Sequence, residues 1–453
     1  MGGPPGWRSD EEGASAGIAG ARRLRQARRG RAGDLLSDAI LIDDLANPRL
    51  PLEVRALDWL GRPFARRLLP LDPESLLTLA ARKTGLRDFG DASFREPLEV
   101  LLRAAEREAE LSVLGRISTR GLVLQLLTQR LRLEALFRQH PEIEQERIER
   151  PIIIAGLPRT GTTHLHNLLS QHPGLRSLPY WESLEPFPDP HEKRAADGRD
   201  LRVVRCERAL KFLHRVMPLF PRMHEMTSDA RHEEIQLLAL EFSTMLFESS
   251  YVVPSYRAWY KAHDQTPAYR TLERALKALQ WLRGPKRWVL KSPQHLEQLP
   301  ALIEVFPDAT VVQTHRDPLR ITASLCTMLA YGHRMNARRV DPIAIGRDWA
   351  TRVEDLLRGS IEGRVALPPG QVIDVHFTEF MKDDVATAER VLEFAGEEVG
   401  ETSRAAFRAY MDANPRGKHG SIRYRLEDVG LDPAERREAL RFYSDHFGVA
   451  EEP

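Results

Sequence analysis

Cysteine, long apolar runs and net charge are all scarce in this sequence, and each shortage excludes a class of protein. The 453 residues include only Cys206 and Cys326, without C-x-x-C spacing, which argues against a disulfide-rich scaffold and a cysteine-based zinc site. No window approaches the roughly 18 consecutive apolar residues of a membrane-spanning helix, and the N-terminus lacks the apolar segment of a secretory signal. We therefore expect a cytoplasmic protein, with a single Cys206–Cys326 bridge as the alternative.

The charges are nearly balanced, since 66 Lys+Arg stand against 65 Asp+Glu for a formal net charge of +1. This balance argues against bulk nucleic-acid binding. Hydrophobic residues make up 42% and charged residues 29%, as in a globular protein with a substantial core. Residues 1–33 are rich in Arg, Gly and Ala, and we expect a disordered tail there. An organelle transit peptide or a contact with an anionic surface is the alternative.

Residues 34–150 carry a helical pattern. Leu98, Leu101, Leu102 and Ala105 recur at the spacing of one helix face, and residues 122–137 repeat that spacing. Several prolines between residues 48 and 73 divide the earlier part into short helices and turns. No catalytic residue types cluster here, so we expect a helical extension that caps the fold or joins copies of the chain into a homo-oligomer.

From residue 151 onward, short apolar runs alternate with helical patterns. The runs span residues 151–156, 287–291, 309–314 and 371–376. Runs this short, apolar and rich in β-branched residues are typical of buried parallel strands. Residues 151–453 are therefore predicted to form an α/β domain, a P-loop-like parallel sheet flanked by helices.

A loop with two glycines, Gly156 to Thr163, follows the first predicted strand. A tight turn between a strand and a helix points backbone N–H groups at one position, where the helix dipole favours an anion. Gly161 lets the backbone approach a phosphate or sulfate, Thr162 and Thr163 add hydroxyl donors, and Arg159 adds a cation. The sequence predicts an anion site.

The spacing of this loop is similar to G-x-x-x-x-G-K-[ST], but Thr162 stands where that motif has lysine. P-loop kinases and NTPases use the lysine on the β- and γ-phosphates, so its absence counts against them. A P-loop small-molecule kinase or NTPase remains one alternative function. A catalytically inactive nucleotide-binding scaffold protein is the other.

The segment 157–163 resembles the 5′-phosphosulfate loop of sulfotransferases, which use 3′-phosphoadenosine-5′-phosphosulfate (PAPS) as donor. Cytosolic members usually have lysine where Arg159 stands, whereas bacterial sulfotransferase-family proteins and tyrosylprotein sulfotransferases have arginine. Arg316, after the third predicted strand, and Ser324, eight residues later, resemble the family's 3′-phosphate site. An arginine at a strand end and a serine two helical turns on can converge on one phosphate.

Two further segments resemble the same family. Lys291, in Lys291-Ser292-Pro293, matches a lysine that lies near the transferred sulfuryl group. Arg416, Gly417 and Lys418 match the late basic loop that closes over the donor nucleotide. The resemblance covers roughly residues 150–440 and implies PAPS as co-substrate, with no metal.

The resemblance also implies a division of roles. Arg159, Thr160, Gly161, Thr162 and Thr163 would hold the 5′-phosphate, and Arg159 and Lys291 would neutralise charge that develops during transfer. The acceptor hydroxyl needs a general base, for which Glu182 and His295 are rival candidates and His164 is a weaker third.

The acceptor is open at this point. Small molecules, carbohydrates, lipids, phenols and peptides are all sulfated within the superfamily, and no motif selects one. Residues 242–260 are rich in Phe, Met, Tyr and Trp, which favours a buried core over an acceptor pocket.

Overall fold

The computed structural model describes residues 40–415, 418 and 420–452. The chain divides into two compact units at residue 40, and everything below concerns the second unit. The predicted tail at residues 1–33 therefore lies outside the described residues, and so do Arg416 and Gly417.

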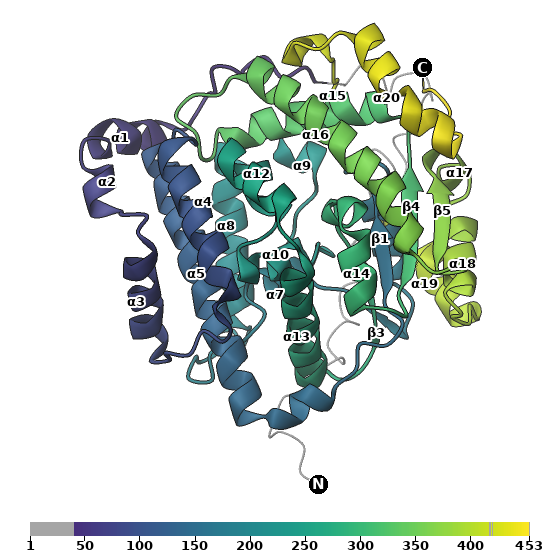
Figure 1. Cartoon of the computed structure of the whole chain (residues 1–453), viewed down its shortest axis with the longest axis horizontal. Coiled ribbons are helices and arrows are strands. Elements are labelled where there is room, and N and C mark those ends of the chain that lie inside the picture. The colour runs from purple at the N-terminus through teal and green to yellow at the C-terminus, as the bar shows by residue number, and fades with distance from the viewer. Residues whose placement is uncertain (1–39, 416–417, 419, 453) are drawn as a thin grey trace, which may run out of the picture. The chain divides into compact units, whose positions relative to one another are not determined.

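The second unit is mainly helical around one small sheet (Figure 1). The strands are β1 (Ile152–Ala155), β2 (Leu175–Arg176), β3 (Arg287–Lys291), β4 (Thr310–His315) and β5 (Val372–His376). The helices before β1 are α1 (Leu52–Gly61), α2 (Ala65–Leu68), α3 (Pro73–Thr84), η2 (Ala92–Phe94), α4 (Arg95–Arg107), α5 (Val113–Gln139) and η3 (Pro141–Gln145). Those between β1 and β4 are α6 (Thr162–Leu169), α7 (Tyr180–Leu184), α8 (Leu201–Val216), α9 (Phe220–Met223), α10 (Ile235–Leu238), η4 (Ala239–Glu241), α11 (Met245–Ser250), α12 (Pro254–Ala262), α13 (Thr266–Arg283), η5 (Pro293–Glu297) and α14 (Leu299–Val305). Those after β4 are α15 (Pro318–His333), α16 (Pro342–Gly363), η6 (Arg364–Ala366), α17 (Phe377–Phe380), α18 (Asp384–Phe394), α19 (Glu401–Ala413), η7 (Glu427–Val429) and α20 (Pro433–Phe447).

All five strands run parallel in the order β2-β3-β1-β4-β5. β1 lies in the middle, where Ile153 pairs with Leu290 of β3 and with Val311 of β4. Its four residues are all buried, so the strand contacts protein on both faces. A strand of this kind has a continuous apolar sequence, which is why residues 152–155 include three successive isoleucines. The predicted α/β sheet is confirmed, and the two-residue strand β2 is an addition to it.

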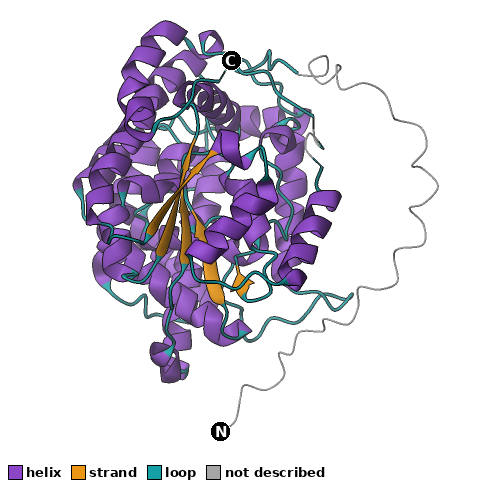
Figure 2. Ribbon diagram, turned by 90° about the vertical axis from the view of Figure 1, so that its right-hand side faces the viewer, coloured by secondary structure: helices purple, strands orange, loops and turns teal. Residues whose placement is uncertain are grey.

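Helices cover both faces of the sheet (Figure 2). On one face, α6 and α18 bury leucine, valine and alanine side chains against Ile152, Ile154 and Val312. Because burial of each such side chain stabilises the fold by about 1.5–3 kcal/mol, this layer fixes the strand ends from which the site is built.

The first five helices lie apart from the strands, on the left of Figure 1. The 27-residue helix α5 packs against α1, α3 and α13, so these helices extend the fold beside the sheet. Ser112 caps α5 at its start by accepting from the Gly115 N–H. Whether residues 34–150 form a separate domain stays a prediction.

Two findings concern the few cysteines of the sequence and its lack of long apolar runs. Cys206 and Cys326 are both buried and free, so the single bridge kept as an alternative does not form. Among the helices described, none combines the length and apolarity that a bilayer crossing requires.

Candidate functional site

A cavity of about 740 Å³ opens at the carboxyl ends of the parallel strands. Arg159 follows β1, Lys291 ends β3, Arg316 follows β4 and Phe377 follows β5, and all four line the cavity. Open parallel sheets bind ligands at this edge because loops from several strands converge there. We call this part of the lining the donor side.

The loop after β1 is held in an unusual backbone conformation. Arg159 and Gly161 both have positive φ, at 75° and 86°. Glycine adopts that conformation freely, but for arginine it costs roughly 1–2 kcal/mol. Two contacts hold the strained residue: Arg159 Nη1 donates to the Met223 carbonyl at 2.8 Å, and the Arg159 carbonyl accepts from Arg316 Nη1 at 2.7 Å.

The helix α6 begins directly after this loop. Gly161 stands at its N-cap without a capping side chain, so the first-turn N–H groups keep their capacity to bind an anion. Gly161, Thr162 and Thr163 line the cavity. Thr160 is used internally, because its hydroxyl bonds to the Leu157 carbonyl and to Thr314 Oγ1.

Arg316 lies between the end of β4 and the start of α15, and its side chain contacts the loop that follows β1. Besides its bond to the Arg159 carbonyl, its guanidinium lies 3.9 Å from the Phe377 ring centroid. The sequence-predicted partner Ser324 is buried two turns further along α15, and its neighbour Leu325 lines the cavity. Two buried atoms, Ser324 Oγ and Arg159 Nε, have no hydrogen-bond partner among the described residues. Buried polar atoms are normally paired, so these two fit a group that would hydrogen-bond to an anionic ligand.

Arg316 also forms an ion pair with Glu452, close to the end of the described residues. Its Nε and Nη2 each donate to a carboxylate oxygen of Glu452 at 2.7 Å. The Glu452 N–H donates to Asp317 at 2.9 Å, which fixes the segment beside the strand end. A forked guanidinium–carboxylate pair has the geometry that arginine also uses for phosphate.

Lys291 forms an ion pair inside the cavity. Its Nζ contacts the carboxylate of Glu233, and both residues line the cavity. Lys291 is buried, with a side chain only 3% exposed, while that of Glu233 is 20% exposed. The pair therefore places a cation and an accessible carboxylate side by side on the donor side.

Glu182 and His295 lie elsewhere. The Glu182 carboxylate accepts from Arg176 at 2.9 Å and from Arg283 at 2.8 Å, whereas its neighbour Tyr180 is the residue that reaches the cavity lining. His295 is fully buried, and its two ring nitrogens bond to Glu234 and to Tyr269. Neither side chain is among the described residues that line the cavity.

Three histidines do line the cavity. His164 follows the anion loop and bonds to Asp384 at 3.1 Å. Burial, together with the charge of Lys291, lowers the pKa of His224 to about 4. Burial and the neighbouring His224 hold the pKa of His232 well below its usual range. His224 and His232 are therefore neutral near pH 7 and add no positive charge beside Lys291.

Lys418 and Arg222 also contribute positive charge to the lining. Lys418 is exposed, and its Nζ lies 3.4 Å from Asn414 Oδ1. Asn414, Pro415 and Gly420 line the cavity together with Lys418. Among the described residues, no group of three or more His, Cys, Asp or Glu side chains is arranged to hold a metal ion.

Much of the remaining lining is apolar and comes from residues far apart in the sequence. We call it the apolar side, and its members include Phe220, Met245, Leu325, Met328, Leu329 and Trp349. Residues 242–260, predicted to be core, divide between two roles. Phe242, Phe247, Tyr256 and Tyr260 are buried, whereas Met245 and Leu246 face the cavity.

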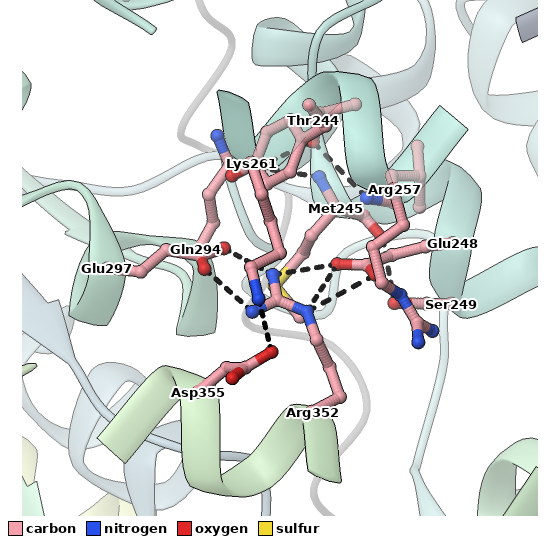
Figure 3. A network of polar contacts seen from close by, with 12 residues as sticks. Thr244, Met245, Glu248, Ser249, Arg257, Lys261, Gln294, Glu297, Arg352 and Asp355 are labelled. Carbon is pink, nitrogen blue, oxygen red and sulfur yellow. Dashed lines mark hydrogen bonds and ion pairs between the residues drawn. The ribbon is translucent and has the colours of Figure 1, made fainter. Parts of the chain in front are cut away.

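A buried ion network supports this wall from behind (Figure 3). Arg352 of α16 binds Glu248 of α11 at 2.8 Å and Glu297 of η5. Gln294 of η5 accepts from the Met245 N–H at 3.1 Å. Removing one member would leave a buried charge unpaired, at a cost of about 3–5 kcal/mol. The network thus fixes α11 and the segment that follows Lys291.

Sequence reasoning missed Glu233, His224 and His232. They belong to an irregular segment between α9 and α10, without a motif or a periodic pattern. The one local signal is the pair of adjacent acids Glu233 and Glu234, of which one reaches Lys291 Nζ and the other the Lys291 backbone N–H. Acidic pairs are common on surfaces, so the signal alone does not identify a site.

Comparison with known proteins identifies the wider family. Over 266 residues the chain is 25% identical to the curated omega-hydroxy-beta-dihydromenaquinone-9 sulfotransferases Stf3 of Mycobacterium bovis and Mycobacterium tuberculosis. The match covers 54% of this chain and 62% of the length of those relatives.

Two solved structures are similar over most of the chain. Sulfotransferase STF9 from Mycobacterium avium is 27% identical, with a TM-score of 0.75 over 84% of this chain and 98% of its own. Sulfotransferase STF1 from Mycobacterium tuberculosis H37Rv is 30% identical, with a TM-score of 0.70 over 81% of this chain and 98% of its own. The model of the sulfotransferase family matches residues 151–401, which hold the sheet, the anion loop, Lys291 and Arg316. By fold, by site and by these matches, the chain belongs to the sulfotransferase family.

Proposed function

We propose that the protein transfers the sulfuryl group of PAPS to a hydroxyl group of a lipophilic acceptor, in the cytoplasm. The proposal rests on the contact between the loop that follows β1 and the arginine that follows β4. Arg316 Nη1 donates to the Arg159 carbonyl at 2.7 Å, so the anion loop and the strand-end arginine lie within reach of one nucleotide. The free state of both cysteines is consistent with a reducing compartment.

The described residues fit the two phosphates of this donor. The uncapped start of α6, Thr162, Thr163 and the unpaired Nε of Arg159 would hold the 5′ end. Arg316 and the unpaired hydroxyl of Ser324 would hold the 3′-phosphate, with Arg316 exchanging Glu452 for it. Lys418 lies where a basic loop would cover the nucleotide.

During transfer the acceptor oxygen forms a bond to sulfur while the bond from sulfur to the bridging phosphate oxygen breaks. The acceptor proton passes to a base, and adenosine 3′,5′-bisphosphate leaves. Lys291 and Arg159 would stabilise the negative charge that develops on the bridging oxygen, in a cavity where such charges interact strongly.

We assign the general base to Glu233. It lines the cavity beside Lys291, whereas Glu182 and His295 are committed to buried partners outside the lining. A base must come within hydrogen-bond reach of the proton that it removes, and its place in the lining, with a side chain 20% exposed, would let Glu233 approach an acceptor bound in the cavity. Glu182 would then act as a structural partner of Arg176 and Arg283.

The lipophilic acceptor follows from the apolar side of the cavity. Phe220, Met328, Leu329 and Trp349 offer a hydrophobic surface with few polar groups, and methionines adapt to irregular ligands. The curated relatives act, by name, on omega-hydroxy-beta-dihydromenaquinone-9. An acceptor whose hydroxyl group lies on a long apolar chain would agree with the apolar lining and with the substrate named for these relatives.

The test of the donor compares thermal stabilisation by adenosine 3′,5′-bisphosphate and by ATP with Mg²⁺. We expect the bisphosphate to stabilise the protein by about 2.7 kcal/mol at 100 times its Kd, and Arg316→Ala to abolish most of that gain. Arg320→Ala, which removes an exposed arginine one helical turn away, is the matched control. Stabilisation by ATP with Mg²⁺ alone would favour the P-loop kinase or NTPase, and bisphosphate binding without turnover of labelled PAPS would favour the inactive scaffold.

A further inference from the structure

The helix α1 directs its apolar stripe toward solvent. Leu52, Ala56, Trp59 and Leu60 share one face at helical spacing, and all four are exposed. The opposite face holds Val54, which is buried. A helix that serves only to build a core would present these two faces the other way round.

The exposed residues continue through α2. Of the thirteen large hydrophobic residues that are exposed in the described chain, six fall within residues 52–68. Five of them define what we call the α1–α2 patch, with exposures of 75% for Leu52, 78% for Trp59, 62% for Leu60, 58% for Phe64 and 71% for Leu68. Concentrated apolar exposure of this kind marks an interaction surface.

Arginines surround the patch. Arg55, Arg62, Arg66 and Arg67 are all exposed, and the same segment holds only two acids, Glu53 and Asp58. Asp58 is already used, because it accepts from the Val113 N–H at 2.8 Å. Tryptophan, phenylalanine and leucine next to exposed arginines are the composition of segments that lie in the interface of an anionic bilayer.

Polar contacts link helix α1 to segments that line the cavity. Glu53 pairs with Arg215 at 2.6 Å, two residues after Leu213, which lines the cavity. A second connection runs from Ser112, next to the Asp58 contact, through Asn336 to Ser250, which also lines the cavity. In Figure 1, α1 and α2 lie at the left edge, beyond α4 and α5.

We propose that the α1–α2 patch docks the protein on an anionic lipid surface. Trp59, Leu60 and Phe64 enter the interface between headgroups and acyl chains, and the arginines bind the lipid headgroups. Docking at this position would deliver an acceptor from the bilayer to the cavity, a consequence that rests on the proposed function. The docking itself does not depend on it.

The arginines decide between a bilayer and a second copy of the chain. A symmetric contact through this patch would bring Arg55, Arg62, Arg66 and Arg67 of two copies together, and like charges at an interface are unfavourable. An anionic surface would pair with Arg55, Arg62 and Arg67, each contributing about 1 kcal/mol at the membrane, whereas Arg66 already pairs with Glu106 at 3.0 Å. The charge pattern thus favours lipid over the homo-oligomer, which was one of the two roles that the sequence left open for this helical segment.

The test is co-sedimentation of the full chain with vesicles of phosphatidylcholine alone or with phosphatidylglycerol. We expect binding to the anionic vesicles, weakened by salt. The triple variant Trp59→Gln, Leu60→Gln, Phe64→Gln should bind at least about tenfold more weakly, since each buried apolar side chain contributes more than 1 kcal/mol. The matched control, Ile343→Gln, Val365→Gln, Phe394→Gln, removes three exposed apolar residues elsewhere and should bind like the unmodified chain.

Each other outcome overturns the proposal. Failure of the unmodified chain to bind anionic vesicles, or equal binding by both triple variants, removes the lipid surface. If the first variant instead converts a dimer to a monomer in light scattering, the patch is an interface between copies. Thermal stabilisation by adenosine 3′,5′-bisphosphate should be the same in all three proteins, so a failure of docking is distinguishable from a failure of the proposed function.

Discussion

The donor side and the apolar side of the cavity are built in different ways. On the donor side, Arg159, Gly161, Thr162 and Thr163 come from one short loop, and Arg316 comes from the end of the adjacent strand. On the apolar side, Phe220, Met245, Met328 and Trp349 come from four different helices. Backbone groups and cations are concentrated on the donor side, whereas side chains of packed helices form the apolar side.

This difference separates what the family shares from what each member can vary. The anion loop depends on positive φ at Arg159 and Gly161 and on the contact with Arg316, so few substitutions preserve it. A wall of leucine and methionine side chains tolerates changes of similar volume. The donor should therefore be common to the family, and acceptor choice should follow the helices that line the apolar side.

Exchange of the proposed base gives the largest expected effect. Glu233→Gln should lower kcat for a long-chain primary alcohol by about 10²–10⁴-fold, because a general base contributes about that much. Binding of adenosine 3′,5′-bisphosphate should change little, and Glu233→Asp should restore part of the rate. Turnover is measured with labelled PAPS over a range of pH.

Glu182→Gln is the matched control for that experiment. It exchanges a carboxylate held between Arg176 and Arg283, so we expect a lower Tm with turnover largely retained in the folded protein. If Glu182→Gln abolishes turnover and Glu233→Gln does not, the base is Glu182 and the ion pairs must open in the reaction.

A substitution on the apolar side should have a smaller effect, and that effect should be limited to binding of the acceptor. Met328→Gln keeps the length of the side chain but introduces an amide that an apolar ligand cannot satisfy, at a cost of about 1–3 kcal/mol. The KM for the long-chain alcohol should rise about tenfold, while bisphosphate binding stays constant. Met328→Leu should behave like the unmodified protein, and a loss of bisphosphate binding in Met328→Gln would show that the two sides are not separable.

The same difference explains how much the sequence could predict. The strands β1, β3 and β4 are buried on both faces and β5 on one, and each left a short run rich in apolar residues from which it was predicted. β2 was missed because it has only two residues, Leu175 and Arg176, and takes its place from pairing with β3. Arg159 was predicted from the loop that follows the first strand, and Lys291 and Arg316 were predicted because the strand-end segments that hold them resemble those of the family.

The proposed base and the apolar side of the cavity required the structure. Glu233 reaches Lys291 across 58 positions of the chain, from a segment with no periodic pattern. Glu182 was a reasonable candidate by resemblance, but arginines at positions 176 and 283 engage its carboxylate, and that arrangement depends on how α7 and α13 pack. The exposed apolar face of α1 also required the structure, because periodicity shows that a face is apolar without showing what covers it.

The smallest effect concerns the carboxylate that already occupies Arg316. Glu452→Gln removes a charge that must leave the guanidinium before a 3′-phosphate can bind. The pair is partly exposed, 21% for Arg316 and 18% for Glu452, so it is worth about 1 kcal/mol at most and its loss should tighten bisphosphate binding by about threefold to fivefold. Glu451→Gln is the control, since that side chain is 72% exposed and lies 3.7 Å from Arg437. Calorimetric titration of both variants measures the difference. Equal affinities would mean that Glu452 does not compete with the 3′-phosphate for Arg316. The affinity for the bisphosphate would then depend on the anion loop and its neighbouring strand alone.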